Sequence, residues 1–298
     1  MPKNIDIKLI LSMIIVGLVW GTTFLGISVA VETIPPWYST TIRNFIAASI
    51  ILIILLFQKE FKWIGWFSLR QQVILSVLML VFANGFTTVA EQTLPSGLTS
   101  IISAVNPVVI FLLSISFQLQ KPTWKGFFGV LLGFSGVLFI FKDGLGDILN
   151  PDYKTGVLFL SFAILSWGLG TIYSKKLSSQ PNNLALNLFY QFLLASLIQL
   201  VLSVLLHPNS EIENWSEKSI GAVVYLAIFG SVITMFCYQY ALQRVSPIQV
   251  SILTYVNTTI AVFLGWYLNN EVVTKDFIIA VILIIIGVFV INYKGKKL

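Results

Sequence analysis

The stretch ASIILIILLF at residues 48–57 is apolar at almost every position, so a helix through it would be apolar on every face. FIIAVILIIIGVFVI at residues 277–291 has the same character near the other end of the chain. A surface helix of a soluble protein keeps one polar face. A strand of a membrane barrel alternates apolar and polar residues over about 10 positions. Neither pattern fits, so these stretches predict helices that cross a lipid bilayer.

The composition of the whole chain agrees with this prediction. Of its 298 residues, 57% are hydrophobic and 10% are charged, and its mean hydropathy is +0.90. A soluble domain has about 25% charged residues, and a transmembrane helix needs about 20 mostly apolar residues. Ten stretches qualify, at residues 9–31, 36–57, 70–90, 95–117, 124–141, 155–174, 184–206, 219–241, 246–267 and 273–292. The predicted fold is an all-α integral membrane protein with ten transmembrane helices.

The loop charges predict how the chain lies in the membrane. With the N-terminus in the cytoplasm, thirteen of the 18 Lys and Arg residues fall on the cytoplasmic side and four on the outer side, with Arg43 inside a helix. Such a Lys and Arg bias on short loops sets topology. We therefore expect both termini in the cytoplasm and a location in the plasma membrane, the inner membrane if the source is bacterial. The net charge of +6 reflects this asymmetry and indicates no nucleic-acid partner.

The sequence contains a weak internal repeat. Residues 90–141 align with 241–292 at an offset of 151, and nearer the start of each half the offset is 147. The alignment pairs Asn106 with Asn257 and Trp20-Gly21 with Trp167-Gly168. It predicts two five-helix units at residues 1–147 and 148–298. Because five is odd, the second unit is inverted in the membrane, an arrangement typical of secondary transporters whose substrate site lies near the midplane.

Three motifs resemble those of a known family. WGTTFLGI (20–27), TIRNFIAA (41–48) and TYVNTTIAVFLGWYLNNEVVT (254–274) are similar to segments of the drug/metabolite transporter superfamily, specifically its EamA-like ten-helix carriers. The resemblance covers about residues 9–293. It implies a metabolite carrier, often an exporter, with a central cavity lined mainly by helices one, three, four, six, eight and nine.

The chain departs from the family pattern at two places. Thr258 stands where the family usually has a proline after the second amide. Gln118 and Gln120 replace a glutamate near the end of the fourth helix, whereas Glu271 keeps its place in the second half. These departures make the two halves less symmetric than is usual and do not challenge the fold.

Two amides are the first candidates for the substrate site. Asn106 and Asn257 lie near the middle of the fourth and ninth stretches, with Ser103 and Thr254 one turn earlier. An unpaired amide in hydrocarbon costs roughly 2–7 kcal/mol, so these faces must point inward. They could line a cavity, or they could form interhelical hydrogen bonds worth about 0.6–2 kcal/mol. Pro107 frees a backbone carbonyl, or it only kinks the helix.

Aromatic and polar residues of the other central helices complete the set of candidates. Trp20 and Trp167 lie near helix centres and would form a wall for organic solutes or pack in the core. The predicted substrate-binding residues are Trp20, Asn84, Ser103, Asn106, Trp167, Tyr238, Gln239, Thr254, Tyr255 and Asn257. A structural or gating role is expected for Arg43, Glu91 and Pro107. Charge inside a membrane helix is a mark of function, but we expect Arg43 to pair with Glu91 or with helix-end carbonyls.

Other classes of protein fit the sequence less well. GFSG at residues 133–136 matches the serine motif of rhomboid proteases, but the serine would need a base nearby and no predicted helix contains a histidine. Its glycines are better explained by close helix packing. A channel would need a selectivity-filter run, and the sequence contains none. The one cysteine, Cys237, and the one histidine, His207, form no cluster that predicts a metal site.

These observations predict a secondary transporter that exports small polar or amphiphilic metabolites, such as amino acids, by alternating access. An uptake permease or an exchanger of the same fold is the alternative. No enzyme activity, cofactor or metal is expected. The partners would be a small-molecule substrate and the lipid bilayer, and a homodimer is left open.

Overall fold

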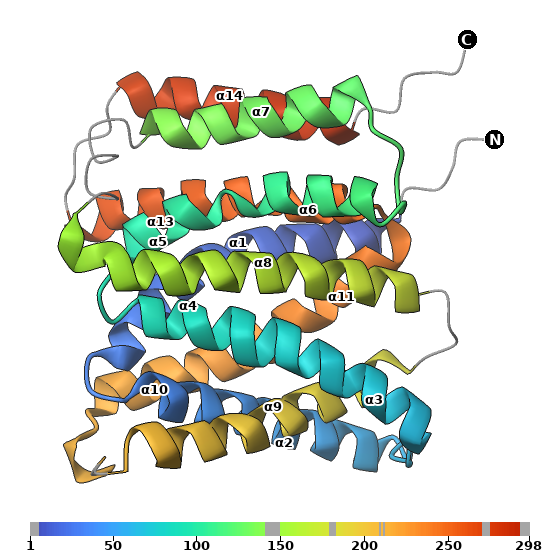
Figure 1. Ribbon diagram of the computed structural model, residues 1–298, viewed down its shortest axis with the longest axis vertical. Helices are drawn as coiled ribbons and strands as arrows, with labels where there is room; N and C mark the ends of the chain where they lie inside the picture. Colours follow the sequence, from blue (N-terminus) through green and yellow to red (C-terminus); the bar gives the residue numbers. More distant parts are fainter. Residues whose placement is uncertain are drawn as a thin grey trace.

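The computed structural model describes residues 6–140, 150–178, 183–208, 210, 212–269 and 275–292, and every regular element in these ranges is a helix (Figure 1). The first half contains α1 (Ile7–Val31), α2 (Pro36–Phe57), α3 (Gly65–Leu75), η1 (Ser76–Asn84), α4 (Gly85–Ala90), α5 (Ser96–Ser103), α6 (Asn106–Ser116) and α7 (Trp124–Ile140). The predicted all-α class is confirmed.

The second half is also helical. It contains η3 (Pro151–Tyr153), α8 (Lys154–Leu177), α9 (Leu184–Leu206), η4 (Ile212–Asn214), α10 (Glu217–Tyr225), η5 (Leu226–Ile233), α11 (Thr234–Arg244), α12 (Pro247–Ser251), α13 (Leu253–Asn269) and α14 (Lys275–Asn292). The predicted unit boundary at 147/148, most of the acidic segment 143–152 and Glu271 lie outside the described residues.

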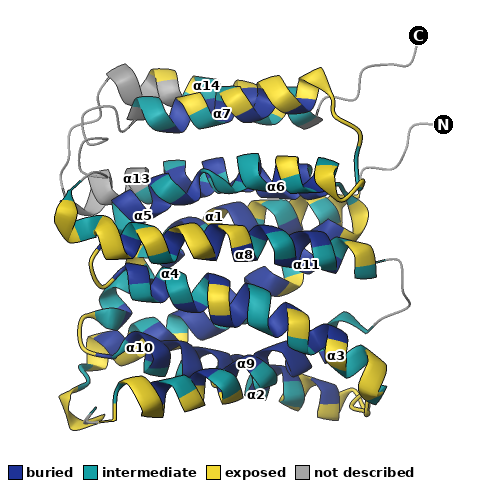
Figure 2. Cartoon of the chain, in the orientation of Figure 1, coloured by how far each residue is buried: buried dark blue, intermediate teal, exposed yellow. Residues whose placement is uncertain are grey.

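Seven helical segments of the described chain are long and apolar enough to cross a membrane: Ile7–Val31, Pro36–Phe57, Gly65–Ala90, Ser96–Ser116, Pro151–Leu177, Leu184–Leu206 and Glu217–Arg244. Trp124–Phe139 and Val281–Ile291 are shorter apolar helices. Large apolar side chains are exposed on the peripheral helices, for example Leu205 on α9 and Ile285 on α14 (Figure 2). Apolar surface of this extent fits contact with lipid rather than with water.

The helices form two peripheral pairs on either side of a central group. Figure 1 shows α7 beside α14 at one edge and α2 beside α9 at the opposite edge, and both pairs are in extensive contact. Between them, α1 packs against α13 and α11, whereas α8 packs against η1, α4 and α6. The α7–α14 contact is close, because a Cβ added at Gly287 would lie 2.7 Å from the carbonyl oxygen of Gly129. The glycines around the GFSG motif therefore serve helix packing.

Four of the expected helices are irregular where the sequence predicts continuous α-helix. The fourth stretch is broken between Ser103 and Asn106, and the ninth between Ser251 and Leu253. Pro107 lies in the first turn of α6, where a missing N–H costs little. The third and eighth stretches each contain a π-helical segment, η1 and η5. π-helical turns are rare and concentrate at functional sites. The region between these four irregular segments is therefore the candidate functional site.

Candidate functional site

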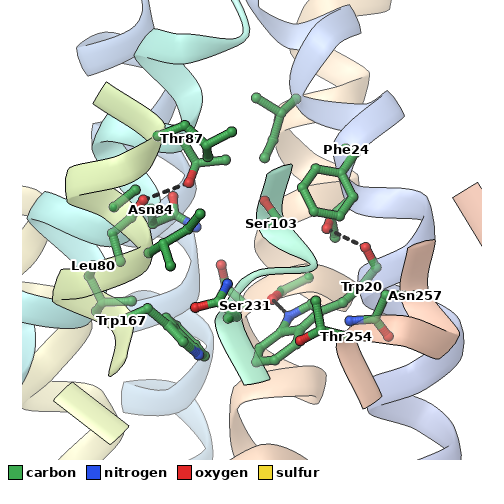
Figure 3. Close-up of a pocket in the computed structure, with 18 of the residues that line it drawn as sticks. Trp20, Phe24, Leu80, Asn84, Thr87, Ser103, Trp167, Ser231, Thr254 and Asn257 are labelled. Atoms are coloured by element: carbon green, nitrogen blue, oxygen red, sulfur yellow. Dashed lines mark hydrogen bonds between the residues drawn. The ribbon is translucent and has the colours of Figure 1, made fainter. Parts of the chain in front are cut away.

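A cavity lies among the irregular segments. It has an empty volume of about 830 Å³, which includes space open to solvent, and its lining comes from α1, α2, η1, α4, α5, α6, α8, η5, α11 and α13 (Figure 3). Seven of the ten predicted substrate-binding residues line it: Trp20, Asn84, Ser103, Asn106, Trp167, Thr254 and Asn257. All six helices implied by the family resemblance contribute, and α2 adds Arg43.

One wall of the cavity is aromatic. The rings of Trp20 and Trp167 meet edge to face, with centroids 5.2 Å apart. Tyr238 lies against both, at 5.1 Å from Trp20 and 5.2 Å from Trp167. Its hydroxyl shares a 2.6 Å hydrogen bond with Thr171, and the side chain is only 1% exposed. Tyr238 therefore packs against the two indoles but does not line the cavity.

The glycine that follows each tryptophan brings its helix close to a broken helix. A Cβ added at Gly21 would lie 2.8 Å from Ile260 Cβ and 2.9 Å from the carbonyl oxygen of Asn257, both in α13. A Cβ added at Gly168 would lie 2.9 Å from a methyl group of Leu113 in α6. Each tryptophan is thus held beside the broken helix of the other half of the chain, and only glycine allows so close an approach.

The π-helical segments release backbone carbonyls that side chains from other helices then bind. Ser166 Oγ donates to the carbonyl of Leu78 at 2.9 Å, and Gln199 Nε2 donates to that of Leu80 at 2.9 Å. The carbonyl of Gly230 in η5 accepts the indole N–H of Trp20 at 3.2 Å. A buried carbonyl in a membrane protein must find such a partner, because lipid offers none. Nothing in the local sequence marked these segments, so sequence reasoning missed them.

The two amides differ in their surroundings. Asn257 is 4% exposed, and in the orientation that satisfies its hydrogen bonds its Nδ2 donates to the carbonyls of Gly17 (2.8 Å) and Leu253 (2.9 Å). It therefore joins α13 to α1 while also lining the cavity. Asn106 lines the cavity, but its buried Oδ1 has no hydrogen-bond partner among the described residues. Its hydrogen-bonding capacity is left partly unused.

Arg43 is the charged group of the cavity, and it is 4% exposed. Its Nε donates to Ser231 Oγ at 2.8 Å, and its Nη1 lies 3.4 Å from Asn84 Oδ1. These partners differ from the predicted carboxylate or helix-end carbonyls, since they are a hydroxyl of η5 and an amide of η1. Glu91 is also buried, at 5% exposed, and neither of its carboxylate oxygens has a hydrogen-bond partner in the described part of the chain.

Two further predicted residues lie away from the cavity. Gln239 accepts a 2.6 Å hydrogen bond from Ser174 Oγ and lines a smaller, amide-rich pocket with Gln72 and Gln191. Tyr255 is fully buried, and its hydroxyl donates to the carbonyl of Val130 in α7 at 3.0 Å. No group of three His, Cys, Asp or Glu residues that could hold a metal occurs in the ranges the structure covers.

Comparison with known proteins places the chain in a family. The model of the EamA-like transporter family matches residues 7–142 and again 154–293. The chain is 26% identical to the uncharacterized transporter YoaV of Bacillus subtilis, over 98% of this chain and 99% of that protein. It is 28% identical to the uncharacterized inner membrane transporter YedA of Escherichia coli, over 94% and 89% of the two chains.

Two further comparisons extend this result. Protein PagO of Salmonella typhimurium is 26% identical over 92% of this chain and 90% of its own. A solved crystal structure covers 99% of this chain and 100% of its own with a TM-score of 0.78, and its 19% identity shows likeness of fold alone. With family-model matches over nearly all of its length, the chain belongs to the EamA-like transporter family of the drug/metabolite transporter superfamily and is a multi-pass membrane transporter.

Proposed function

We propose that this transporter is a secondary carrier that exports small polar or amphiphilic metabolites, such as amino acids, across the bacterial inner membrane by alternating access. One observation carries the proposal: three pairs of polar or aromatic lining residues have one member from each half of the chain. The pairs are Trp20 with Trp167, Ser103 with Thr254, and Asn106 with Asn257. A site at the meeting of two inverted units is typical of carriers that work by alternating access.

The packing of the helices supports two inverted five-helix units and ten crossings. Helix α1 of the first half packs against α13 of the second, and α8 of the second half packs against α6 of the first in the equivalent way. Each half also has a π-helical segment in a corresponding position. The start of α1 and the end of α14 lie at the same end of the molecule (Figure 1). Together with the Lys and Arg bias, this favours two cytoplasmic termini. Cysteine labelling of Lys175→Cys from the inside and Glu213→Cys from the outside tests this topology.

The cavity lies nearer one end of the molecule. Its lining extends to Ile27 and Thr87, which lie within four residues of the ends of α1 and α4. At the opposite end, Lys175 Nζ in α8 donates to the carbonyls of Leu242 (2.7 Å) and Val245 (2.9 Å) at the end of α11. These contacts favour a conformation that is closed at the end bearing both termini. In the proposed topology the cavity then faces outward.

Transport by the purified protein in proteoliposomes tests the proposal. A panel of amino acids, nucleosides and small amphiphiles should include solutes that exchange across the membrane through the protein and saturate with concentration. Export is supported if efflux from vesicles with the protein in its native orientation exceeds uptake, whereas equal rates in both directions favour an exchanger or uptake permease. Ion conductance without saturation would support a channel and contradict a carrier.

A further inference from the structure

The guanidinium of Arg43 uses only part of its hydrogen-bonding capacity. A guanidinium has five N–H donors. Nε donates to Ser231 Oγ at 2.8 Å, and Nη1 reaches Asn84 Oδ1 only at 3.4 Å. No hydrogen bond joins Nη2 to any described residue, although Arg43 is one of the residues that line the cavity. Several N–H groups therefore remain available to a bound molecule.

No anion among the described residues is bonded to this cation. The buried carboxyl group of Glu91 forms no ion pair and no hydrogen bond with Arg43. Ser231 and Asn84 are neutral, so they fix the position of the guanidinium without balancing its charge. A charge buried in a membrane protein is costly, and where it persists it commonly marks the path of a substrate or ion.

The backbone of η5 places this cation directly beside the aromatic wall. The carbonyl oxygen of Gly230 accepts a hydrogen bond from the indole N–H of Trp20. In the next residue, Ser231 Oγ accepts a hydrogen bond from Arg43 Nε. A Cβ added at Gly230 would lie 3.2 Å from Arg43 Nη2 and 2.9 Å from a methyl group of Thr23. The absence of a side chain at Gly230 therefore lets Nη2 lie close to the backbone of η5. One cavity thus offers a cationic fork and, beside it, the apolar faces of two indoles.

We infer that Arg43 binds a carboxylate of the transported solute, and that the apolar or aromatic body of this solute lies against Trp20 and Trp167. This inference rests on the proposed carrier function and names its substrate class. Two parallel N–H groups of a guanidinium match the two oxygens of a carboxylate. A single cation balances one negative charge, which favours a monocarboxylate, or an amino acid with its carboxylate directed to Arg43, over a phosphate ester with nearly two charges.

Ligand-induced stabilisation of the full-length protein in detergent tests this assignment. The probes share one aromatic body and differ in one group: phenylpropionate, phenylpropionamide and phenylpropylamine. A ligand that binds the folded state raises Tm. We expect phenylpropionate to raise the Tm of the unaltered protein, and the amide and the amine to have little effect. If the amide matches the carboxylate, or if none of the three binds, the inference is wrong.

Substitutions then assign the effect to Arg43. Arg43→Gln should weaken phenylpropionate binding about 10- to 100-fold, because hydrogen bonds to a charged group are lost. Arg43→Lys should retain part of the affinity, because it keeps the charge without the fork. The matched control is Arg70→Gln, which alters an exposed arginine of α3 and should bind as the unaltered protein does. Undiminished binding by Arg43→Gln would overturn the inference.

A further variant keeps the test usable if Arg43→Gln does not fold. Gly230→Ala retains the cation and crowds Nη2, so it should weaken the binding of phenylpropionate by several fold. Unchanged affinity would count against the assignment. Proteoliposome transport separates this inference from the proposed function. Saturable transport of neutral or cationic solutes without any preference for carboxylates would refute the role of Arg43 and leave the carrier intact. Absence of any transport would refute the carrier itself.

Discussion

The indole Nε1 of Trp20 donates a 3.2 Å hydrogen bond to the carbonyl oxygen of Gly230. The two residues are 210 positions apart, and the bond joins the middle of α1 to the π-helical segment of the other half of the chain. It fixes the edge of the aromatic wall and satisfies a carbonyl that a regular α-helix would not expose. One contact thus links the shape of the cavity to the irregularity of the helix behind it.

Replacing this indole by a smaller ring should lower the stability of the fold and weaken transport. Trp20→Phe leaves the Gly230 carbonyl without its partner, at a cost of about 1–3 kcal/mol, and shortens the aromatic wall. We expect a lower Tm in detergent and a raised KM for transport. Trp66→Phe, at a position 74% exposed, is the control and should change neither. An unaltered Tm for Trp20→Phe would mean that the bond contributes nothing to the fold.

Two amides of the cavity, Asn106 and Asn257, should respond differently to the same substitution. Asn257→Leu removes the hydrogen bonds to the Gly17 and Leu253 carbonyls, so it should lower both Tm and transport. Asn106→Leu removes an oxygen that has no partner in the described residues, so it should impair transport while Tm stays close to that of the unaltered protein. Ser135→Ala, at an exposed position of α7, is the control for both measurements. Wild-type transport by both leucine variants would mean that the amides only hold helices together.

A buried amide network between α2, α9 and η1 should contribute to stability. Gln199 is fully buried, accepts a 2.7 Å hydrogen bond from Asn44 Nδ2 and donates to the carbonyl of Leu80. Gln199→Leu leaves both partners unsatisfied, and each unsatisfied buried group costs about 1–3 kcal/mol. We expect a clear fall in the free energy of unfolding, measured by denaturant titration in mixed micelles. Gln92→Leu, at an exposed position, is the control; an equal fall in both would contradict the role of the network.

Close packing of α1 against α13 should depend on the absence of a side chain at Gly21. Gly21→Ala places a Cβ 2.8 Å from Ile260, so α1 must move away from α13. We expect a reduced yield of folded protein and reduced transport by what remains. Gly97→Ala is the control, because a Cβ there meets nothing within 4 Å, and alanine favours helix over glycine. Normal yield and transport for Gly21→Ala would show that the two helices tolerate separation.

The sequence was sufficient to predict the class and part of the cavity. Long apolar stretches determine a membrane helix by length alone, and the internal repeat drew attention to Asn106 and Asn257, both of which line the cavity. Tyr255 was also predicted to bind substrate, but it does not line this cavity, because residues two apart on a helix point about 200° apart. It faces α7, whereas Asn257 faces the cavity.

The irregular segments and the partners of Arg43 could not be predicted. The π-helical segments are accompanied by hydrogen bonds from distant residues, such as Ser166 to the carbonyl of Leu78, which no local propensity encodes. The sequence suggested that Arg43 would pair with Glu91 or with helix-end carbonyls. Its main partner is instead Ser231, which is 188 residues away in the chain and was not a candidate because an isolated serine carries no signal.

The central claim is that one substrate site is lined by both halves of the chain, and solute protection of single cysteines tests it most directly. Ser103→Cys and Thr254→Cys are each placed in a Cys237→Ser background, because Cys237 is the one native cysteine. Labelling of each by a thiol reagent is measured with and without a transported solute. We predict that the same solute slows labelling at both positions and leaves labelling of Arg70→Cys, at an exposed position of α3, unchanged. Protection at only one position, or at neither, would contradict a site shared by the two halves.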